Sequence, residues 1–531
     1  MKRIIGNYWL VLVMLFAMTS CSIEPKLTDV YGEDVAWSNE ANVELSLNKF
    51  YPLIGQSYYT PHVNQDAYAD ILKRNTPNDE INLHVFGISV MSPGANPLDN
   101  WSWGYNWIRH CNEFLDGLHA NGGDLSEEFV KRAEAEVLFF RAYVYFELAK
   151  RYGASVILYD QLPDGKTRHD RSTPEKVWDF IAADLDKAAA ALPPTVTEAK
   201  RGKLTKGAAY GLKARAMLYA KRWKASSDAV EDLDRLQLYD LHPDYEELFN
   251  QKRRNGDTNK ESILEFGYLS PNFGYSFDYF FCPPGDQGYA QISPTEDLVS
   301  QYQMADGTDF SWANPQHAAD PYVGREPRFY ASILYNGAPW KGRVVETFVG
   351  GKDGFAIGGG TTSTGYYMKK FFDGSIRTQD EGFLPGELTF YFMRYAEALL
   401  IYAEAMAEQD RLSDGLRALN KVRQRAGFTT DLTATNKEHL LNLIRRERMV
   451  ELAFEGHRYW DLRRWGLATS VLNDMNVSGI KVTKDGDQWI YEKIDADNGR
   501  KRVYPERHNR FPIPLTELQR NVEIEQFDEW K

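Results

Sequence analysis

Apolar residues recur every three or four positions along residues 130–148, and this spacing limits what the chain can fold into more than any other feature. The pattern is carried by Val130, Ala133, Val137, Phe140, Val144 and Leu148. Such spacing places apolar side chains on one face of an α-helix. Gly153 follows shortly after, as is typical of a helix C-terminus. We therefore predict a long amphipathic helix here.

Other segments share this periodicity, and some of them form pairs. The spacing predicts helices over residues 41–54, 103–118, 174–192 and 204–221, with Thr173 placed to cap the third. The segment "KGAAYGLKARAMLYAKRWKASSDAV" carries small residues that permit close helix packing and then turns into a second amphipathic segment. A similar pair covers residues 395–403 and 416–422 and ends at Gly427. These pairs predict irregular hairpins similar to tetratricopeptide repeats.

Between about residues 256 and 388 the composition changes. Gly, Pro, Asn, Asp and aromatic residues crowd together without a sustained helical period, as in "YLSPNFGYSFDYFFCPPGDQGYAQISP". Helical periodicity resumes directly afterwards. We therefore predict a mostly α fold with one domain over residues 21–531: a helical repeat scaffold at about 40–255 and 389–531, and a loop and short-strand insertion at about 256–388.

The N-terminus carries an export signal. Lys2 and Arg3 precede an apolar run over residues 9–18, and "MTSC" ends at Cys21. The run is too short to cross a bilayer comfortably. Small residues before a cysteine resemble a bacterial lipoprotein cleavage box, which predicts removal of residues 1–20 and lipidation of Cys21. An ordinary signal peptide with an incidental cysteine is the alternative.

Charge and motifs exclude several functions. The formal net charge of -13 argues against nucleic acid, because binding to phosphate backbones requires excess Lys and Arg. The chain has no P-loop, H-E-x-x-H, C-x-x-C or G-x-S-x-G motif, so we predict no cofactor and no metal site. Carboxylates are abundant, which leaves a glycoside hydrolase open as an alternative. Cys111 and Cys282 either pair or stay free.

The stretch "FEGHRYWDLRRWG" (454–466) concentrates charges and aromatic rings. We expect it to continue the charged helix of "LIRRERMVELAFEG", in which His457 and Asp461 face one another four residues apart. That pair is either a catalytic base with its orienting acid or, as we favour, a structural ion pair. For Arg458, Arg463 and Arg464 we expect local pairing with Glu447, Glu451 and Glu455.

Several long segments resemble one family in order and spacing. They are "RYAEALLIYAEAM" (394–406), "LNKVRQRAG" (419–427), "IRRERMVELAFEGHRYWDLRRWG" (444–466) and "RFPIPLTEL" (510–518). Together they resemble the C-terminal signature of the SusD/RagB family of Bacteroidetes surface lipoproteins. The cleavage box, "WGYNWIRHCNEFL" (103–115) and "EAEVLFFRAYVYFELAKRYG" (134–153) extend the likeness to nearly the whole chain.

The resemblance implies a non-enzymatic protein that captures nutrients above a SusC-like TonB-dependent transporter. It also implies a lipid-anchored protein of the outer membrane that faces the cell exterior, with no nucleic-acid partner. One feature departs from the family: "SIEPK" after Cys21 holds only Glu24 where outward-facing members often carry clustered acids. In this family the motif at 454–466 belongs to the scaffold.

The resemblance points to the segment before residue 103 and to the insertion as the ligand-binding regions. An aromatic ring can stack on the C–H face of a sugar, while polar side chains beside it bind hydroxyl groups. The predicted glycan contacts are the rings of Trp101, Tyr289, Trp312 and Trp340 and the polar residues Asn64, Asp66, Asp70 and Asn100. We expect Trp101 to be the main platform.

The function that these features favour is capture of an oligosaccharide or polysaccharide and its delivery to the transporter. A peptide-binding protein similar to RagB is the first alternative, in which apolar pockets and strand edges would replace the aromatic platforms. A glycoside hydrolase is the second alternative.

Overall fold

The computed structural model describes residues 33–55, 61–162, 169–250, 259–269, 274–356, 360–372, 374 and 386–531. Cys21 and the predicted signal segment lie outside these residues.

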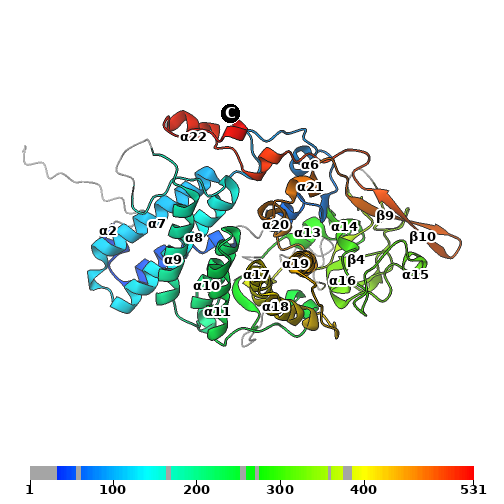
Figure 1. Cartoon of the computed structure of the whole chain (residues 1–531), viewed down its shortest axis with the longest axis horizontal. Coiled ribbons are helices and arrows are strands. Elements are labelled where there is room, and N and C mark those ends of the chain that lie inside the picture. The colour runs from blue at the N-terminus through cyan, green and yellow to red at the C-terminus, as the bar shows by residue number, and fades with distance from the viewer. Residues whose placement is uncertain are drawn as a thin grey trace, which may run out of the picture.

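Long helices form one half of the molecule (Figure 1). The elements of this half are α2 (Glu33–Ala36), α3 (Glu40–Asn48), α4 (Pro52–Gly55), α7 (Trp101–Asn121), η2 (Gly122–Asp124), α8 (Glu127–Tyr152), α9 (Pro174–Ala191), η3 (Glu198–Lys200), α10 (Lys206–Tyr219) and α11 (Trp223–Arg235). After the middle segment come α17 (Tyr395–Glu408), α18 (Leu412–Arg425) and α19 (Lys437–Glu451).

The local signals define these helices largely as predicted. The Ser126 hydroxyl caps α8 by accepting from the N–H of Phe129, and Gly153 ends the helix with a left-handed φ of 67°. The Thr173 hydroxyl caps α9. The helix predicted over residues 41–54 is instead two helices, because Pro52 begins a new one at α4.

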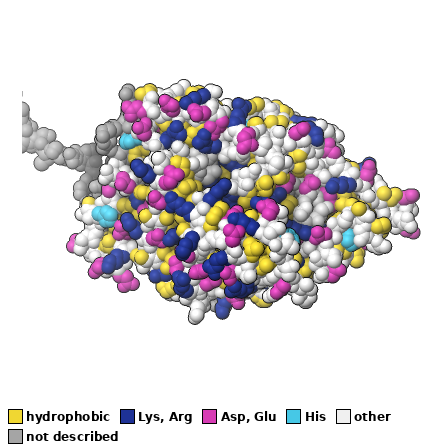
Figure 2. All heavy atoms as spheres, viewed as in Figure 1, with side chains coloured by type: hydrophobic (Ala, Val, Ile, Leu, Met, Phe, Trp, Pro, Cys, Tyr) yellow, Lys and Arg dark blue, Asp and Glu magenta, His cyan; other side chains and the backbone are white. Residues whose placement is uncertain are grey.

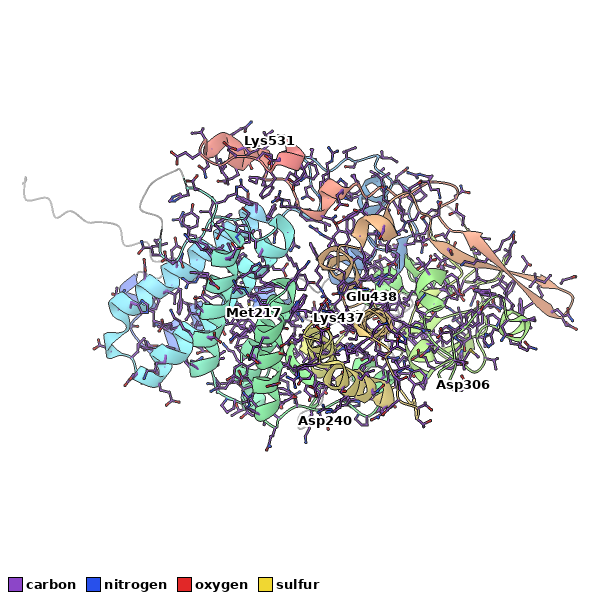
Figure 3. The ribbon with its side chains drawn as sticks, in the orientation of Figure 1. Met217, Asp240, Asp306, Lys437, Glu438 and Lys531 are labelled. Carbon is purple, nitrogen blue, oxygen red and sulfur yellow. The ribbon has the colours of Figure 1, made fainter. Side chains whose placement is uncertain are left out.

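Successive helices stack side by side. Helix α8 packs against α7 and α9, α9 against α10, and α10 against α11. Helix α17 then packs against α11, although the whole middle segment separates them in the sequence, and α18 and α19 follow. This series confirms a mostly helical, tetratricopeptide-like fold. Buried side chains such as Met217 on α10 fill the space between these helices (Figure 3).

Short elements make up the middle segment and the region before α7. They are α5 (Pro61–Asp66), β1 (Leu72–Arg74), α6 (Glu80–Val85), α12 (Tyr245–Asn250), β2 (Ser262–Gly267), α13 (Phe277–Phe281), η4 (Pro284–Asp286), β3 (Ile292–Pro294), α14 (Glu296–Val299), α15 (Pro315–Ala319), α16 (Pro327–Ser332), β4 (Ile333–Leu334), β5 (Pro339–Trp340), β6 (Arg343–Val344), β7 (Tyr367–Met368) and β8 (Thr389–Arg394). The strands pair two by two and antiparallel: β1 with β3, β2 with β8, β4 with β7, and β5 with β6.

The C-terminal region covers the junction between the two halves and ends near α7 (Figure 1). It contains α20 (Arg458–Arg464), α21 (Ala468–Leu472), η5 (Glu506–Asn509), α22 (Leu515–Arg520), η6 (Asp528–Trp530) and a hairpin of β9 (Ser478–Asp485) with β10 (Gln488–Asp495). Among the helices of the described ranges, none combines the length and apolar character that crossing a bilayer requires.

Candidate functional site

The stretch 454–466 does not continue the preceding helix. Helix α19 ends at Glu451 and α20 begins at Arg458. Between them, Phe454 and Gly456 take left-handed backbone angles, with φ of 68° and 77°. Such angles interrupt an α-helix. The prediction of one continuous charged helix is therefore wrong, and a tight turn separates two helices.

His457 and Asp461 do not form the predicted pair. The Nε2 of His457 lies 3.9 Å from a carboxylate oxygen of Glu397. Asp461 instead accepts from the Nε atoms of Arg448 and Arg464, both at 2.8 Å. Burial lowers the pKa of His457 to about 4. An imidazole that is neutral at physiological pH and engaged by the scaffold fits a structural role, as favoured from the sequence.

The local pairing predicted for the three arginines of this stretch is also wrong. None of them binds the upstream glutamates: Arg458 binds Asp70, Arg464 binds Glu404 as well as Asp461 of its own helix, and Arg463 donates to the carbonyl oxygen of Asn509. The turn at residues 452–457 interrupts the helix, so the i,i+4 geometry that would join these arginines to the upstream glutamates is lost.

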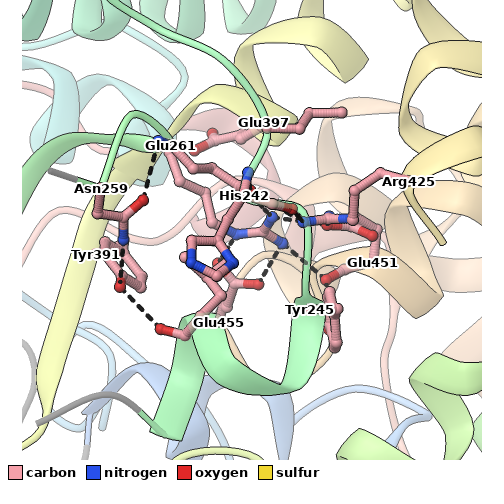
Figure 4. Close-up of polar contacts among 12 residues, drawn as sticks. His242, Tyr245, Asn259, Glu261, Tyr391, Glu397, Arg425, Glu451 and Glu455 are labelled. Atoms are coloured by element: carbon pink, nitrogen blue, oxygen red, sulfur yellow. Dashed lines mark hydrogen bonds and ion pairs between the residues drawn. The ribbon is translucent and has the colours of Figure 1, made fainter.

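The upstream glutamates belong to a buried charge cluster at the junction of α16, α18, α19 and β8 (Figure 4). Glu451 accepts from Arg394 at 2.7 Å and from Arg328 at 2.8 Å. Five cations and five anions take part: Arg328, Lys370, Arg394, Arg423 and Arg425 with Glu261, Glu326, Glu447, Glu451 and Glu455. Because their formal charges balance, the cluster needs no external ion. Its role is to join scaffold elements.

Trp101 is a core residue. Its side chain is 1% exposed and packs edge-on against Tyr152 of α8, with ring centroids 4.9 Å apart. The prediction that this ring offers an open stacking face is wrong, because the packed face of α7 turns it toward α8. Asn100, directly before the helix, is half-buried. Its Oδ1 is buried and has no hydrogen-bond partner within the described part of the chain.

Asp66 and Asp70 are buried anchors, which corrects their prediction as exposed ligand contacts. Asp66 accepts from the backbone N–H of Gly456 at 2.9 Å and of Arg458 at 3.1 Å. Asp70 binds the Arg458 guanidinium at 2.7 and 2.8 Å. Burial raises the pKa of Asp66 to about 8. Burial also opposes ionisation of Asp70, but the adjacent Arg458 outweighs it and lowers that pKa. Both carboxyl groups fasten the segment 61–71 to the turn before α20.

Pairing of β1 with β3 brings this segment beside the middle of the chain. The Nη1 of Arg74 lies 3.5 Å from the Oδ1 of Asn64 and 3.3 Å from the Oε1 of Gln291, and its Nη2 donates to Asp79 at 2.6 Å. The Nε of Arg74 is buried without a hydrogen-bond partner among the residues described. We call Asn64, Arg74, Asp79 and Gln291 the polar edge.

Two tyrosines lie next to the polar edge in the chain. Tyr289 precedes Gln291 by two residues, and its side chain is 49% exposed. The Tyr279 hydroxyl donates to the Tyr289 hydroxyl at 3.0 Å, and the ring centroids are 4.8 Å apart. The two rings, which we call the tyrosine pair, are held at a fixed angle of 68° to one another. Tyr289 is thus an exposed ring, as expected, while its contact with a ligand stays a prediction.

The backbone beside Tyr289 is strained. Gln287 and Ala290 take left-handed φ angles of 62° and 47°. For residues with a Cβ this conformation costs about 1 kcal/mol or more, so surrounding contacts must hold it. Buried Asn75 is one such contact, because its Nδ2 donates to the carbonyl of Ala290 at 2.5 Å and its Oδ1 accepts from Ser363.

An ion cluster holds the other end of the same loop. The Arg343 guanidinium binds Asp286 at 2.9 Å and Asp353 at 2.6 Å. Asp353 also accepts from the backbone N–H of Gly285 at 2.8 Å. The loop that presents Tyr289 is therefore fixed before any ligand arrives, which reduces the ordering cost of binding.

The tyrosine pair and the polar edge form the candidate site. The rings offer apolar faces for stacking, and the partly exposed amide groups of Asn64 and Gln291 offer hydrogen bonds to hydroxyls, while buried Arg74 orients them. Acidic and basic side chains are interspersed on the face shown in Figure 2, with no broad field of one sign. This combination suits a neutral ligand that carries many hydroxyl groups.

Comparison with known proteins gives the family. The family model described as "SusD family" matches residues 246–530, more than half of the chain. The chain belongs to the SusD family. A second model, "Starch-binding associating with outer membrane", matches residues 6–218. Among curated relatives of this SusD-family chain, SusD-like protein P25 of Formosa agariphila is 23% identical over 97% of both chains, and a SusD-like protein of Bacteroides ovatus is 26% identical over 75% of this chain and 69% of its own.

Solved structures agree with the fold. A SusD-like protein of Bacteroides fragilis superposes with a TM-score of 0.81 at 29% identity, covering 93% of this chain and 98% of that one. A SusD-like carbohydrate-binding protein of the same organism gives a TM-score of 0.78 at 26% identity, covering 92% and 99%. The resemblance that the sequence motifs indicated is thus confirmed.

Two other rings predicted to contact a ligand in the SusD-family chain are those of Trp340 and Trp312. Trp340 is 8% exposed and packs near Phe372, so its prediction as an open platform is wrong. Trp312 is half-buried, and its indole N–H donates to buried Glu296 at 2.7 Å. Its contact with a ligand stays a prediction.

The two described cysteines of the SusD-family chain do not form a disulfide. Cys111 and Cys282 are both free and buried, which settles the pairing that the sequence left open. Burial raises the pKa of the Cys282 thiol well above its ordinary value, so it stays protonated. Within the described ranges, no group of three or more His, Cys, Asp or Glu side chains is arranged to hold a metal ion.

Sequence reasoning missed Arg74, Gln291 and Tyr279. Arg74 ends a three-residue strand, and only the pairing of β1 with β3 shows that it reaches Gln291. Tyr279 lies in the aromatic run "YSFDYFF", where nothing distinguishes an exposed ring from its buried neighbours Phe277 and Phe281. A short run of this kind carries no usable periodicity.

Proposed function

We propose that this SusD-family chain captures neutral polysaccharide at the tyrosine pair and the polar edge and delivers it to a SusC-like TonB-dependent transporter. In this proposal Cys21 is lipidated, and the folded part is displayed on the outer face of the outer membrane. The chain binds its ligand without cleaving it.

The pairing of β1 with β3 carries the proposal. It places Asn64 and Arg74, from the N-terminal part, against Gln291, two residues from an exposed tyrosine. Stacking on a ring needs no charge on the ligand, and the polar edge can select among hydroxyl arrangements. The backbone of the loop at Tyr289 is strained and is held in place by surrounding contacts. Backbone strain of this kind is common at functional sites, so it supports a binding role.

The relatives support a carbohydrate as the ligand. One family model is described as starch-binding, and a similar solved structure is described as a carbohydrate-binding protein. Two predicted carboxylates, Asp66 and Asp70, are buried and engaged by the turn before α20. A glycoside hydrolase would need a pair of carboxyl groups open to the substrate, and these two are not open to one.

Affinity electrophoresis tests the proposal. The full mature chain would be run through gels that contain starch, laminarin, xylan, galactomannan or no polysaccharide. We expect at least one neutral polysaccharide to retard the wild-type chain and Tyr289→Ala to reduce that retardation about tenfold, since a lost aromatic contact is worth about 1.4 kcal/mol. Trp489→Ala removes another exposed ring, 38% exposed on the β9–β10 hairpin, and is the matched control.

The outcomes separate the alternatives. If Tyr289→Ala and Trp489→Ala reduced retardation equally, the tyrosine pair would not be the binding site. Retardation by no polysaccharide, together with binding of peptides, would replace the proposal by peptide capture. Release of reducing sugar from a retarding polysaccharide would show that the chain is an enzyme.

A further inference from the structure

A groove lies between the α9–α10 connection and strand β2. It has two lobes, with volumes of about 330 Å³ and about 240 Å³. Both lobes are lined by Arg201, Gly202 and Glu265, so they meet at these residues. We call the two lobes together the β2 groove. The larger lobe alone reaches the size of a small-molecule site, roughly 300 to 1,000 Å³.

The β2 groove is distinct from the candidate site. Residues 194–203 form one wall, and residues 259–269 form the other. None of the described residues that line it belongs to the tyrosine pair or the polar edge. It belongs to the helical half and its junction with β8, whereas the candidate site is built on β1 and β3.

Among the described residues that line the β2 groove, the charges balance. The three cations are Arg201, Lys203 and Lys260, and the three anions are Glu198, Glu265 and Glu387. Arg201 is paired with Glu198, and the Lys203 ammonium donates to Glu44 at 2.7 Å. A groove without excess charge, in which two of the cations already have protein partners, favours a neutral ligand over an anionic one.

The same groove offers apolar rings and hydroxyl groups. Tyr268 is half-buried, and its ring is fixed by Tyr275 and Phe390 at centroid distances of 5.3 and 5.6 Å. Tyr239 lines the larger lobe and packs closely against Gly207. A Cβ added to Gly207 would lie only 2.0 Å from the Tyr239 hydroxyl. Exposed hydroxyls of residues such as Thr195 line the opposite wall.

We propose that the β2 groove is a second binding site for a neutral carbohydrate chain. The proposal rests on the proposed function, because it assigns the same class of ligand to another surface. Two lobes joined at Gly202, where a Cβ would lie 3.6 Å from the Glu265 carbonyl, suit consecutive units of an extended chain better than one compact molecule. Two sites on one tethered protein would hold a long polysaccharide more tightly than either site alone.

Isothermal titration calorimetry on the full mature chain tests this proposal. The probe is a defined oligosaccharide cut from a polysaccharide that retards the wild-type chain. Thr195→Trp fills the larger lobe from an exposed position, and Thr430→Trp places the same side chain at an exposed position after α18 as the matched control. Tyr289→Ala weakens the candidate site about tenfold. Thermal unfolding of each variant checks that the fold is intact.

We expect two oligosaccharides per wild-type chain and per Thr430→Trp chain, and one per Thr195→Trp chain. The Tyr289→Ala chain should bind two, one of them about tenfold more weakly than in the wild type, and the chain that carries both Thr195→Trp and Tyr289→Ala should bind one, about tenfold more weakly. A Thr195→Trp variant that binds like the wild type, whether the wild-type stoichiometry is one or two, would overturn the second site and leave the proposed function intact. If Thr195→Trp abolished all binding while Tyr289→Ala changed nothing, the groove would stand and the candidate site would fall. If no polysaccharide bound, both would fall.

Discussion

The buried charge cluster and the tyrosine pair are built in similar ways and are used differently. The cluster joins segments that are distant in the sequence, the tyrosine pair joins residues 10 positions apart, and each is held rigidly by contacts around it. In the cluster, every charged side chain has a protein partner of opposite charge. At the tyrosine pair, the hydroxyl groups are engaged while the face of Tyr289 remains open. The buried charges therefore stabilise the fold, and the exposed ring of Tyr289 is the one that we propose for contact with a ligand.

Glu451→Ala should cause the largest loss of stability. A small loss would contradict the structural role of the buried charge cluster. It leaves Arg328, Arg394 and Arg425 without a shared buried partner, and we expect a loss of about 3 to 5 kcal/mol in the free energy of unfolding. Urea denaturation measures it. Glu438→Ala, at the start of α19 (Figure 3), removes a carboxylate that is 69% exposed and paired with Arg445. That control should lose less than about 1 kcal/mol.

Trp101→Ala should have a comparable effect on stability and almost none on binding. Removing a buried indole costs about 3 to 5 kcal/mol. The variant that remains folded at low temperature should keep the wild-type affinity for polysaccharide within about twofold, because the ring lies in the core. A small loss of stability with a large loss of affinity for polysaccharide would show that Trp101 contacts the ligand.

Asp66→Asn should change how stability depends on pH. The pKa of Asp66 is about 8 in the folded chain and near 3.8 in the unfolded one. The folded state therefore binds the extra proton between these values, and the stability that it contributes is present at low pH and lost as pH rises toward 8. Relative to the Asp66→Asn variant, the wild type should lose at most about 1.4 kcal/mol for each pH unit in this window.

Asp70→Asn is the matched control for that experiment. Arg458 lowers the pKa of Asp70, so its contribution is present above its ordinary pKa and is lost only as pH falls below it. Across pH 5 to 8 the Asp70→Asn variant should thus differ from the wild type by a constant amount. A constant difference for Asp66→Asn as well would show that Asp66 is ionised throughout, held by its two backbone N–H donors.

Gln291→Ala should have the smallest effect. It removes the acceptor at 3.3 Å that helps orient Arg74, and it shortens a side chain of the polar edge. One hydrogen bond of this kind contributes about 0.5 to 1.5 kcal/mol, so we expect affinity for polysaccharide to fall about threefold to tenfold. Gln424→Ala, on the exposed face of α18, should leave the affinity unchanged. Equal affinities for the two variants would remove the polar edge from the site.

The sequence predicted the scaffold well because its signals are local. Apolar periodicity, the cap at Thr173 and the glycine at residue 153 each act within a few residues, and all three are confirmed. The break between α19 and α20 was missed, because left-handed Phe454 is not a residue type that signals such a turn. The family motifs nevertheless led to the correct fold.

The candidate site could be predicted only in part, because burial depends on partners far away in the sequence. Trp101 and Tyr289 look alike in the sequence, each an aromatic residue beside turn-forming residues, and only packing against α8 separates them. In the sequence, Asp66 and Asp70 resemble exposed loop acids. In the fold they are buried, because Gly456 and Arg458 bind them. The polar edge exists only once β1 pairs with β3.

A crystal structure of the full mature chain with an oligosaccharide from a retarding polysaccharide tests the central claim most directly. We predict a sugar ring stacked on Tyr289 at van der Waals distance, with its hydroxyl groups bound by Asn64 or Gln291, and the buried charge cluster unchanged. An oligosaccharide bound elsewhere, with Tyr289 bare and the polar edge in contact with solvent alone, would contradict it.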